Sequence, residues 1–239
     1  MIAQVAFRKT SLVDFPGCIA AALFLPGCDF RCPYCHNTAL VDPARADGEL
    51  VPLGEFLAFL DRRKKLLGGV AISGGEPLLH EELPRLAAAI RERGLAVKLD
   101  TNGSFPERLA PLLGGEGLLD YVALDLKTAP SAYARVAPGL PDAAQRVLES
   151  LRLLREARGR GGPAFELRLT CAPGVVGPAE AGELAALLEP EDEVVLQEFR
   201  PGGCLDPAWD SVDPYGPETM AGLLAAIKAA APRARIRGA

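Results

Sequence analysis

Three cysteines with short spacing are the residues of this chain best suited to chemistry. Cys28, Cys32 and Cys35 form the pattern C-x3-C-x2-C. A cubane 4Fe-4S cluster is normally held by four cysteine thiolates, so three thiolates from one loop would leave one iron without a protein ligand. The pattern therefore indicates a cluster whose open iron binds a small molecule, and that iron would be the reactive one.

The elements that must position this loop follow a repeated βα pattern. Short apolar runs alternate with longer amphipathic segments, which predicts a parallel sheet. The expected strands are 19–25, 70–73, 95–100, 121–126, 165–170 and 193–198. The expected helices are 53–67, 81–93, 106–113, 143–157, 179–188 and 217–230. Six units are fewer than the eight of a closed barrel. We therefore expect an α/β fold, a partial (β/α)6 TIM-like barrel whose parallel sheet has a lateral opening.

Length and composition predict a single folded domain rather than several. The chain has 239 residues, of which 49% are hydrophobic, enough for one sizeable core. We expect a single domain over 1–239, in which 1–17 form an N-terminal hairpin with a partner-binding loop and 18–239 form the partial barrel. Residues 159–163 are glycine-rich and are expected to be a loop rather than a domain boundary.

The expected compartment is the cytoplasm, without membrane or nucleic-acid partners. The start of the chain has no charged segment followed by an apolar one, and the apolar run 19–25 is too short to cross a bilayer. Six cysteines in a cytosolic chain more often indicate metal binding or catalysis than disulfides. A net charge of -5 gives no general attraction to phosphate backbones.

Most of the unusual polar residues fall at the carboxyl ends of the expected strands. They are Ser-Gly-Gly-Glu-Pro at 73–77, Asp-Thr-Asn-Gly at 100–103, Asp-Leu-Lys at 125–127, Arg168, and Gln-Glu-Phe-Arg at 197–200. Each is a weak signal alone, because Asp-Thr-Asn-Gly is also a common turn or helix start. Together they predict a single site, because barrel active sites lie at this end of the strands.

The cysteine pattern and the Gly-Gly-Glu-Pro segment at 74–77 resemble the radical S-adenosylmethionine (SAM) superfamily in spacing, order and strand position. The resemblance implies that Cys28, Cys32 and Cys35 ligate a 4Fe-4S cluster whose fourth iron is chelated by the amino and carboxylate groups of SAM. Thiolates are soft ligands suited to iron–sulfur chemistry. One electron passed into the sulfonium would yield methionine and a 5'-deoxyadenosyl radical, while the protein supplies position and excludes water.

The same resemblance assigns residues to the other end of SAM. Gly74, Gly75 and Glu76 are expected to meet the methionyl amino group, where glycines allow close backbone approach. Tyr34 occupies the aromatic position before the last cysteine, whose main chain is expected beside the adenine. The side chain of Tyr34 could equally pack under the loop.

A narrower resemblance, to the activating enzymes of glycyl radical enzymes, covers almost the whole chain. It rests on the segments 14–17 (Asp-Phe-Pro-Gly), 35–37 (Cys-His-Asn), 99–103 (Leu-Asp-Thr-Asn-Gly) and 124–127 (Leu-Asp-Leu-Lys). It implies that Asp100, Thr101 and Asp125 hold a monovalent cation, Na+ or K+, for which oxygen ligands are suitable. Lys127 and Arg168 match basic positions near the SAM carboxylate and ribose, where a cation pair would fix a carboxylate.

Two segments, 9–17 and 197–202, look most like the activating protein of anaerobic ribonucleoside-triphosphate reductase. Phe15 stands where activases of pyruvate formate-lyase usually have glycine, and Phe199 where they carry a histidine. The implied function is formation of a glycyl radical on that reductase, with the 14–17 loop as the candidate contact to the substrate peptide. Activation of pyruvate formate-lyase or another glycyl radical enzyme is the alternative. The chemistry also implies flavodoxin or ferredoxin as electron donor.

Zinc binding and simple electron transfer are the main chemical rivals. A structural zinc site needs four ligands, but Cys18 is expected at the opposite end of the first strand, roughly 30 Å away at ~3.3 Å per residue. Cys171 and Cys204 fall near the site and could be pocket residues, redox-labile thiols or packing residues. An iron–sulfur electron carrier would keep all four irons ligated, which three cysteines do not.

A third alternative is a radical SAM enzyme that acts on a small metabolite or a peptide. Maturases of that kind typically carry extra carboxy-terminal cysteine clusters. No cysteine follows Cys204 in this sequence, and 217–230 has the pattern of an ordinary amphipathic helix.

Overall fold

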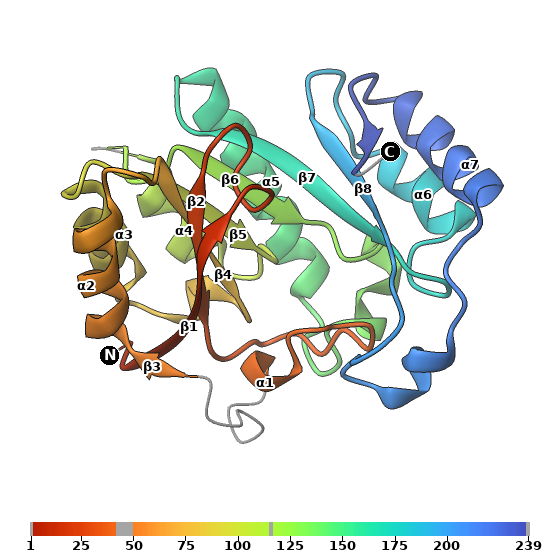
Figure 1. Ribbon diagram of the computed structural model, residues 1–239. Coiled ribbons are helices and arrows are strands. Elements are labelled where there is room, and N and C mark those ends of the chain that lie inside the picture. The colour runs from red at the N-terminus through yellow and green to blue at the C-terminus, as the bar shows by residue number, and fades with distance from the viewer. Residues whose placement is uncertain (1, 42–49, 115–116, 238–239) are drawn as a thin grey trace.

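The computed structural model describes residues 2–41, 50–114 and 117–237, which form a curved nine-stranded sheet covered by helices (Figure 1). The strands are β1 Gln4–Ser11, β2 Ala20–Leu25, β3 Val51–Pro52, β4 Gly69–Gly74, β5 Ala96–Thr101, β6 Tyr121–Asp125, β7 Ala164–Cys171, β8 Val194–Glu198 and β9 Arg235–Ile236. Their order is β3-β1-β2-β4-β5-β6-β7-β8-β9. All pairings from β2 to β9 are parallel, and β1 is antiparallel to both neighbours.

The sheet is not closed into a barrel. Among the described residues no pairing joins β3 to β9, which are the two edges. The six predicted strands correspond to β2, β4, β5, β6, β7 and β8. The predicted parallel α/β architecture with a lateral opening is therefore confirmed.

The helices follow the predicted pattern between the strands. They are α1 Thr38–Val41, α2 Leu53–Arg63, α3 Leu83–Arg91, α4 Pro106–Leu113, α5 Ala143–Gly159, α6 Pro178–Ala185 and α7 Pro217–Lys228, with short 3-10 helices η2 Pro77–Leu79, η3 Pro130–Arg135 and η4 Pro207–Ser211. Proline opens α4, α6 and α7, where its missing N–H costs no intrahelical bond and its fixed φ already suits a helix. The short helices and α1 were not predicted, because segments this brief carry little periodicity.

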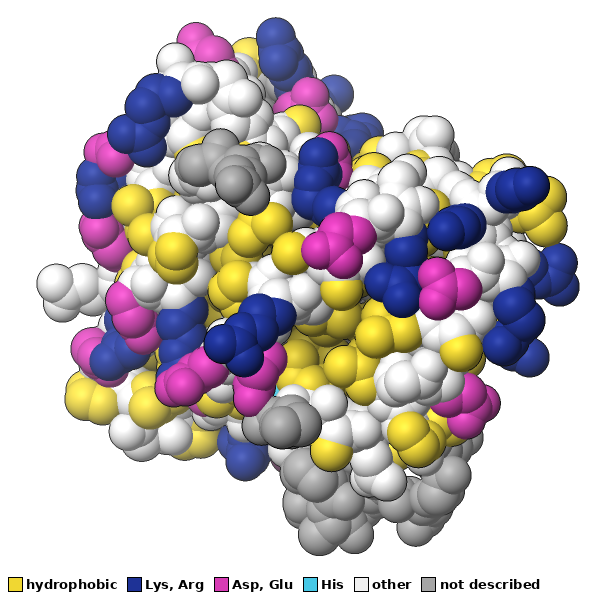
Figure 2. Space-filling view, turned by 90° about the vertical axis from the view of Figure 1, so that its left-hand side faces the viewer, with side chains coloured by type: hydrophobic (Ala, Val, Ile, Leu, Met, Phe, Trp, Pro, Cys, Tyr) yellow, Lys and Arg dark blue, Asp and Glu magenta, His cyan; other side chains and the backbone are white. Residues whose placement is uncertain are grey.

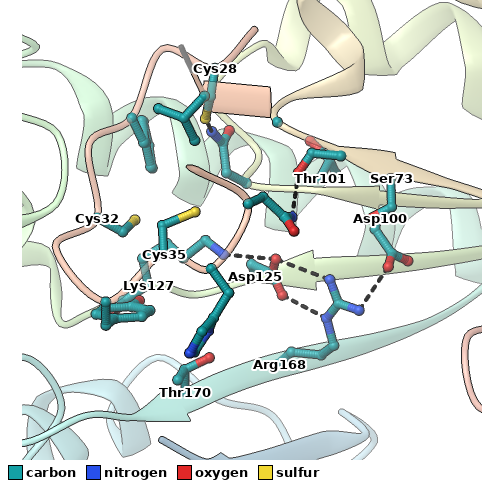
Figure 3. Close-up of a pocket in the computed structure, with 18 of the residues that line it drawn as sticks. Cys28, Cys32, Cys35, Ser73, Asp100, Thr101, Asp125, Lys127, Arg168 and Thr170 are labelled. Atoms are coloured by element: carbon teal, nitrogen blue, oxygen red, sulfur yellow. Dashed lines mark hydrogen bonds and ion pairs between the residues drawn. The ribbon is translucent and has the colours of Figure 1, made fainter. Parts of the chain in front are cut away.

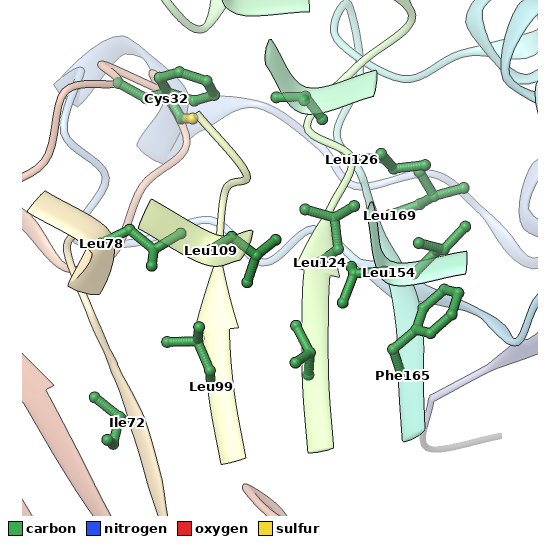
Figure 4. Packing of buried hydrophobic residues seen from close by; sticks show 14 of the residues in the cluster. Cys32, Ile72, Leu78, Leu99, Leu109, Leu124, Leu126, Leu154, Phe165 and Leu169 are labelled. Carbon is green, nitrogen blue, oxygen red and sulfur yellow. The ribbon is translucent and has the colours of Figure 1, made fainter. Parts of the chain in front are cut away.

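Side chains that alternate along each strand place apolar residues on the helix-covered face of the sheet and polar residues on the other face. Leu99 of β5 and Leu124 of β6 are fully buried and pack toward Leu109 of α4 and Leu154 of α5 (Figure 4). Because successive side chains on a strand point to opposite faces, the neighbouring positions turn toward the concave side. The helices thus fill the convex side with hydrophobic side chains, and polar residues gather inside the curve.

The predicted N-terminal hairpin extends beyond residue 17. β1 pairs with β2 from Ala6↔Phe24 to Ser11↔Ala20, so the second arm of the hairpin is the first parallel strand of the sheet. The connecting loop lies at the amino-terminal end of β2. There the Phe15 ring packs against Gly69, where an added Cβ would come within 2.9 Å of the ring.

The surface around α2 and α3 carries both signs of charge. Basic and acidic side chains are interspersed on this side of the molecule (Figure 2). No helix in the described part of the chain is long and apolar enough to cross a membrane.

Candidate functional site

A pocket of about 350 Å³ opens on the concave side of the sheet. It is lined from the loop after β2, from the ends of β4, β5, β6, β7 and β8, and by Asp14 of the β1–β2 loop. It brings together eleven of the twelve predicted site residues: Cys28, Cys32, Tyr34, Cys35, Gly74, Gly75, Asp100, Thr101, Asp125, Lys127 and Arg168. Glu76 is the predicted residue that does not line it.

Hydrogen bonds to backbone carbonyl groups join the cysteine loop to the Gly-Gly segment. The N–H of Glu76 donates to the carbonyl of Gly27 at 2.8 Å, and the Asn37 side chain donates to the carbonyl of Gly74 at 2.8 Å. A Cβ on Gly75 would lie 2.0 Å from the carbonyl oxygen of Gly27. Only glycine therefore allows the two segments to approach this closely.

The three thiols lie around one side of the pocket (Figure 3). Cys32 is buried, and Cys28 and Cys35 are partly buried. Burial raises the pKa of the Cys28 thiol far above its usual range and that of Cys32 to about 11, where Lys127 acts in the opposite direction. The raised pKa values favour the protonated form of Cys28 and Cys32, so binding a metal at these two thiols would release their protons.

The donor set fits an iron–sulfur cluster better than a single metal ion. Among the described residues, no group of three or more His, Cys, Asp and Glu is placed to hold one metal ion. A cubane cluster takes one thiolate on each of several irons, which suits three thiols spread along one wall. The arrangement therefore does not favour the zinc alternative.

A charged network forms the next part of the pocket wall. Arg168 Nε and Nη2 donate to the two carboxylate oxygens of Asp125 at 2.6 and 3.0 Å, and Nη1 donates to Asp100 at 2.9 Å (Figure 3). Lys127 Nζ donates to Asp125 at 2.9 Å, and Lys98 pairs with Asp100. Lys127 and Arg168 line the pocket and so present cationic groups to it, which suits an anionic ligand group, whereas Lys98 is buried and does not line it.

Opposite charges keep this network ionised despite burial. Burial alone would raise the pKa of Asp125, but Arg168 and Lys127 bring it well below its usual range. Burial alone would lower the pKa of Lys127, but Asp125 holds it above its usual range. Because both carboxylates already pair with cationic side chains, the Na+ or K+ site at Asp100, Thr101 and Asp125 stays a prediction.

Glu76 is a structural brace in this arrangement. Its carboxylate is fully buried and accepts hydrogen bonds from Leu78 N at 2.9 Å, Thr101 Oγ1 at 2.7 Å and Asn102 N at 2.7 Å. Burial raises its pKa to about 7, against the effect of these hydrogen bonds. Glu76 thus joins the turn after β4 to the end of β5, and its contact with a methionyl amino group, like that of Gly74 and Gly75, stays a prediction.

The side chain of Tyr34 packs under the cysteine loop, one of the two predicted alternatives. It is 5% exposed, its hydroxyl donates to the Lys127 carbonyl at 3.4 Å, and its ring centroid lies 5.9 Å from that of Trp209. The N–H of Leu205 donates to the carbonyl of Cys35 at 2.9 Å. The segment after β8 therefore supports the cysteine loop from outside.

The remaining cysteines lie outside the pocket lining. Cys171 and Cys204 are buried, and the N–H of Cys204 donates to Asp210 at 2.9 Å. Cys18 lies at the amino-terminal end of β2, where its Sγ faces Gly68. The sequence placed Cys171 and Cys204 near the site, and the structure shows them packed beside it.

Sequence reasoning missed several pocket residues, among them Thr170, Gln197 and Asn102. Asn102 donates to Asp29 at 3.0 Å within the cysteine loop. Thr170 could have been found from strand alternation, because it lies two residues after Arg168 on the same strand. Gln197 belongs to a motif that was recognised without a role for this side chain.

Comparison with known proteins defines the class of this protein. The profile of the Radical SAM superfamily matches residues 23–177, which is more than half of the chain. The protein belongs to the Radical SAM superfamily, whose members use a 4Fe-4S cluster and S-adenosylmethionine.

Relatives within this superfamily point to a narrower group. The chain is 28% identical over 197 residues to the "Putative glycyl-radical enzyme activating enzyme MJ1227" of Methanocaldococcus jannaschii, covering 82% of this chain and 79% of that protein. It is 36% identical over 143 residues to the 7-carboxy-7-deazaguanine synthase of Methanopyrus kandleri, covering 52% of this chain and 55% of that protein. It is 36% identical over 128 residues to the pyruvate formate-lyase 1-activating enzyme of Escherichia coli K12, covering 51% and 50%. The chain thus spans about half the length of the last two.

Proposed function

We propose that this protein is an activase that cleaves SAM reductively and abstracts a hydrogen atom from a backbone glycine of a partner enzyme. The observation that carries the proposal is that three thiols and a network of paired charges that includes Lys127 and Arg168 line one pocket. The similarity to MJ1227 over most of both chains supports the activase class. The bound cluster and SAM would supply the electron and the 5'-deoxyadenosyl radical.

The protein's own residues would bind and orient these groups. Cys28, Cys32 and Cys35 would ligate the cluster. Lys127 and Arg168 would hold the SAM carboxylate, because Asp125 fixes both cations from behind. Partial burial of this network reduces its screening by water.

The Gly-Gly segment and the end of β5 would complete the SAM site. The backbone of Gly74 and Gly75 would approach the methionyl amino group, since neither residue carries a side chain that would intervene. Asp100 and Thr101, with Asp125, would supply oxygen ligands if a monovalent cation binds beside the carboxylate.

For the partner, we propose anaerobic ribonucleoside-triphosphate reductase. The support is the likeness of segments 9–17 and 197–202 to its activating protein. Asp14, in the first of these segments, lines the pocket, so the loop can reach a bound peptide. Pyruvate formate-lyase is the alternative partner, favoured by the similarity to the E. coli activase. Flavodoxin or ferredoxin in the cytoplasm would supply the electron.

A second candidate function is chemistry on a small metabolite. The similarity to a 7-carboxy-7-deazaguanine synthase favours it, although the alignment covers only 52% of this chain. The two functions differ in where hydrogen is taken from, since only the activase leaves a radical on a protein.

The direct test of SAM chemistry uses the reconstituted, reduced protein under anaerobic conditions. We expect methionine and 5'-deoxyadenosine in equal amounts, measured by liquid chromatography. A reduced cluster whose electron paramagnetic resonance spectrum does not change on adding SAM, together with no 5'-deoxyadenosine, would refute the proposed function.

A further inference from the structure

Two polar side chains face the pocket without any partner. Thr170 on β7 and Gln197 on β8 are register partners, and both are partly buried and line the pocket. In the part of the chain that the structure describes, neither side chain makes a hydrogen bond. By contrast, Asp125, Lys127 and Arg168 are engaged with one another.

The pair continues the pocket wall beyond Arg168 toward the open edge of the sheet. Arg168 and Thr170 are two residues apart on β7 and therefore point to the same concave side. Figure 3 shows Thr170 on the side of the pocket away from Cys28. Beyond β8 the sheet continues only with the two-residue β9, so Gln197 lies close to the open edge of the sheet. A polypeptide entering from this edge would pass the pair.

The chemistry of the pair matches a peptide backbone. A glycine offers no side chain, so the groups beside its α-carbon that a protein can recognise are backbone N–H and C=O. A glutamine carboxamide carries an acceptor and two donors, and a threonine hydroxyl both donates and accepts. If a substrate covered these groups without pairing with them, their desolvation would weaken binding, so a ligand with matching donors and acceptors is favoured here.

We propose that Thr170 and Gln197 bind the backbone amide groups of the substrate polypeptide next to its target glycine. This inference rests on the proposed activase function and adds the mode of substrate recognition. It implies that Thr170 and Gln197 recognise the extended backbone of the substrate rather than the side chains that flank the glycine. Thr170 and Gln197 are therefore positioning residues for the peptide and do not bind SAM.

The test uses the reconstituted holoenzyme and an acetylated, amidated heptapeptide, three alanines on each side of one α,α-dideuterated glycine. Deuterium in 5'-deoxyadenosine, measured by mass spectrometry, reports hydrogen abstraction from the glycine. The variants are Thr170→Val and Gln197→Met, which keep volume but remove hydrogen-bonding groups. Thr170→Ser keeps the hydroxyl, and Gln145→Met on the exposed face of α5 is the matched control.

We expect each of the first two variants to raise the peptide KM roughly tenfold, the effect of one lost hydrogen bond. SAM cleavage without peptide should stay unchanged, and Thr170→Ser and Gln145→Met should behave as the unaltered protein. An unchanged peptide KM in both variants would overturn the inference and leave the activase function intact. An equal loss of peptide-free SAM cleavage would also overturn it, because the pair would then serve SAM. If the unaltered protein cleaves SAM but transfers no deuterium from the peptide, this inference fails, because an extended backbone around a glycine is then not what the pocket recognises, whereas the activase function is decided separately by the glycyl radical signal of a partner enzyme.

Discussion

Two carboxylates in this molecule each pair with two basic side chains, but one lines the pocket and the other is fully buried away from it. Asp125, at the carboxyl end of β6, pairs with Arg168 and Lys127. Asp192, just before the amino-terminal end of β8, is fully buried and pairs with Arg155 at 2.5 Å and Arg158 at 3.3 Å.

The difference lies in what each network faces. Asp192 also accepts a hydrogen bond from the N–H of Glu189 at 2.9 Å, and it joins α5 to the turn before β8 without lining the pocket. The network of Asp125 faces the cavity that contains the three thiols. A buried ion pair therefore does not define a site by itself, and the open cavity with nearby reactive groups does. The ion pairs of Asp192 lie near the amino-terminal end of β8, whereas those of Asp125 lie at the carboxyl ends of the strands, where active sites of this class of fold are found.

The cysteines at the two ends should give the largest contrast. We expect Cys32→Ala to reduce SAM cleavage to the background rate, because the cluster would lose one of three protein ligands. Cys18→Ala, at the opposite end of β2, should cleave SAM normally. The measurement is 5'-deoxyadenosine formation after anaerobic reconstitution. Cleavage by Cys32→Ala with a normal cluster spectrum would refute the ligand assignment.

Replacing Gly75 should disrupt the site by displacing the backbone of the cysteine loop. Gly75→Ala would place a Cβ 2.0 Å from the Gly27 carbonyl oxygen, so the cysteine loop must shift. We expect the variant to incorporate much less iron, measured as iron and sulfide per chain. Gly54→Ala is the control, because an added Cβ there meets nothing within 4 Å and alanine favours the helix by about 1 kcal/mol. Full iron content in Gly75→Ala would contradict the close fit of the two segments.

Replacing each of the two carboxylates by asparagine tests the comparison between the two charged networks. Asp125→Asn should raise the KM for SAM roughly tenfold or more, since Lys127 and Arg168 lose the charge that holds them. Asp192→Asn should lower the free energy of unfolding by about 3 kcal/mol, because Arg155 and Arg158 lose the buried carboxylate with which they pair, and should leave the KM unchanged. Denaturant unfolding and steady-state kinetics separate these outcomes. A raised KM in Asp192→Asn would show that the two ends are coupled.

The smallest effect is expected at Tyr34. Its hydroxyl makes one long hydrogen bond to the Lys127 carbonyl, at 3.4 Å. Tyr34→Phe should therefore change the free energy of unfolding by less than about 1 kcal/mol and leave SAM cleavage unaffected. A marked loss of cleavage, measured at saturating SAM, would show that the hydroxyl has a role beyond packing.

Hydrophobic periodicity predicted most of the strands and helices, and the spacing of the motifs indicated the candidate site residues. The strands β2 and β4 to β8 were predictable because buried parallel strands read as short apolar runs between amphipathic helices. The cysteine loop could be recognised because its three thiols lie close together in the sequence. Short elements such as α1 and η4 lack enough residues to show a period.

The parts that could not be predicted depend on contacts between distant segments. The assignment of Glu76 to the methionyl amino group stays a prediction, whereas its hydrogen bonds to Thr101 and Asn102 arise only when β4 and β5 lie side by side and could not be predicted. The unpaired state of Gln197 is likewise a property of the folded neighbourhood. A sequence shows which groups a residue offers, whereas the fold decides whether those groups are already used.

The measurement that tests the central claim most directly is electron paramagnetic resonance of a partner enzyme. The reduced holoenzyme and SAM are incubated anaerobically with anaerobic ribonucleoside-triphosphate reductase and, separately, with pyruvate formate-lyase. We predict a doublet glycyl radical signal in the reductase that is absent when Cys32→Ala replaces the unaltered protein. A doublet only in the lyase would move the partner assignment, and SAM cleavage without a protein radical in either enzyme would contradict the activase account.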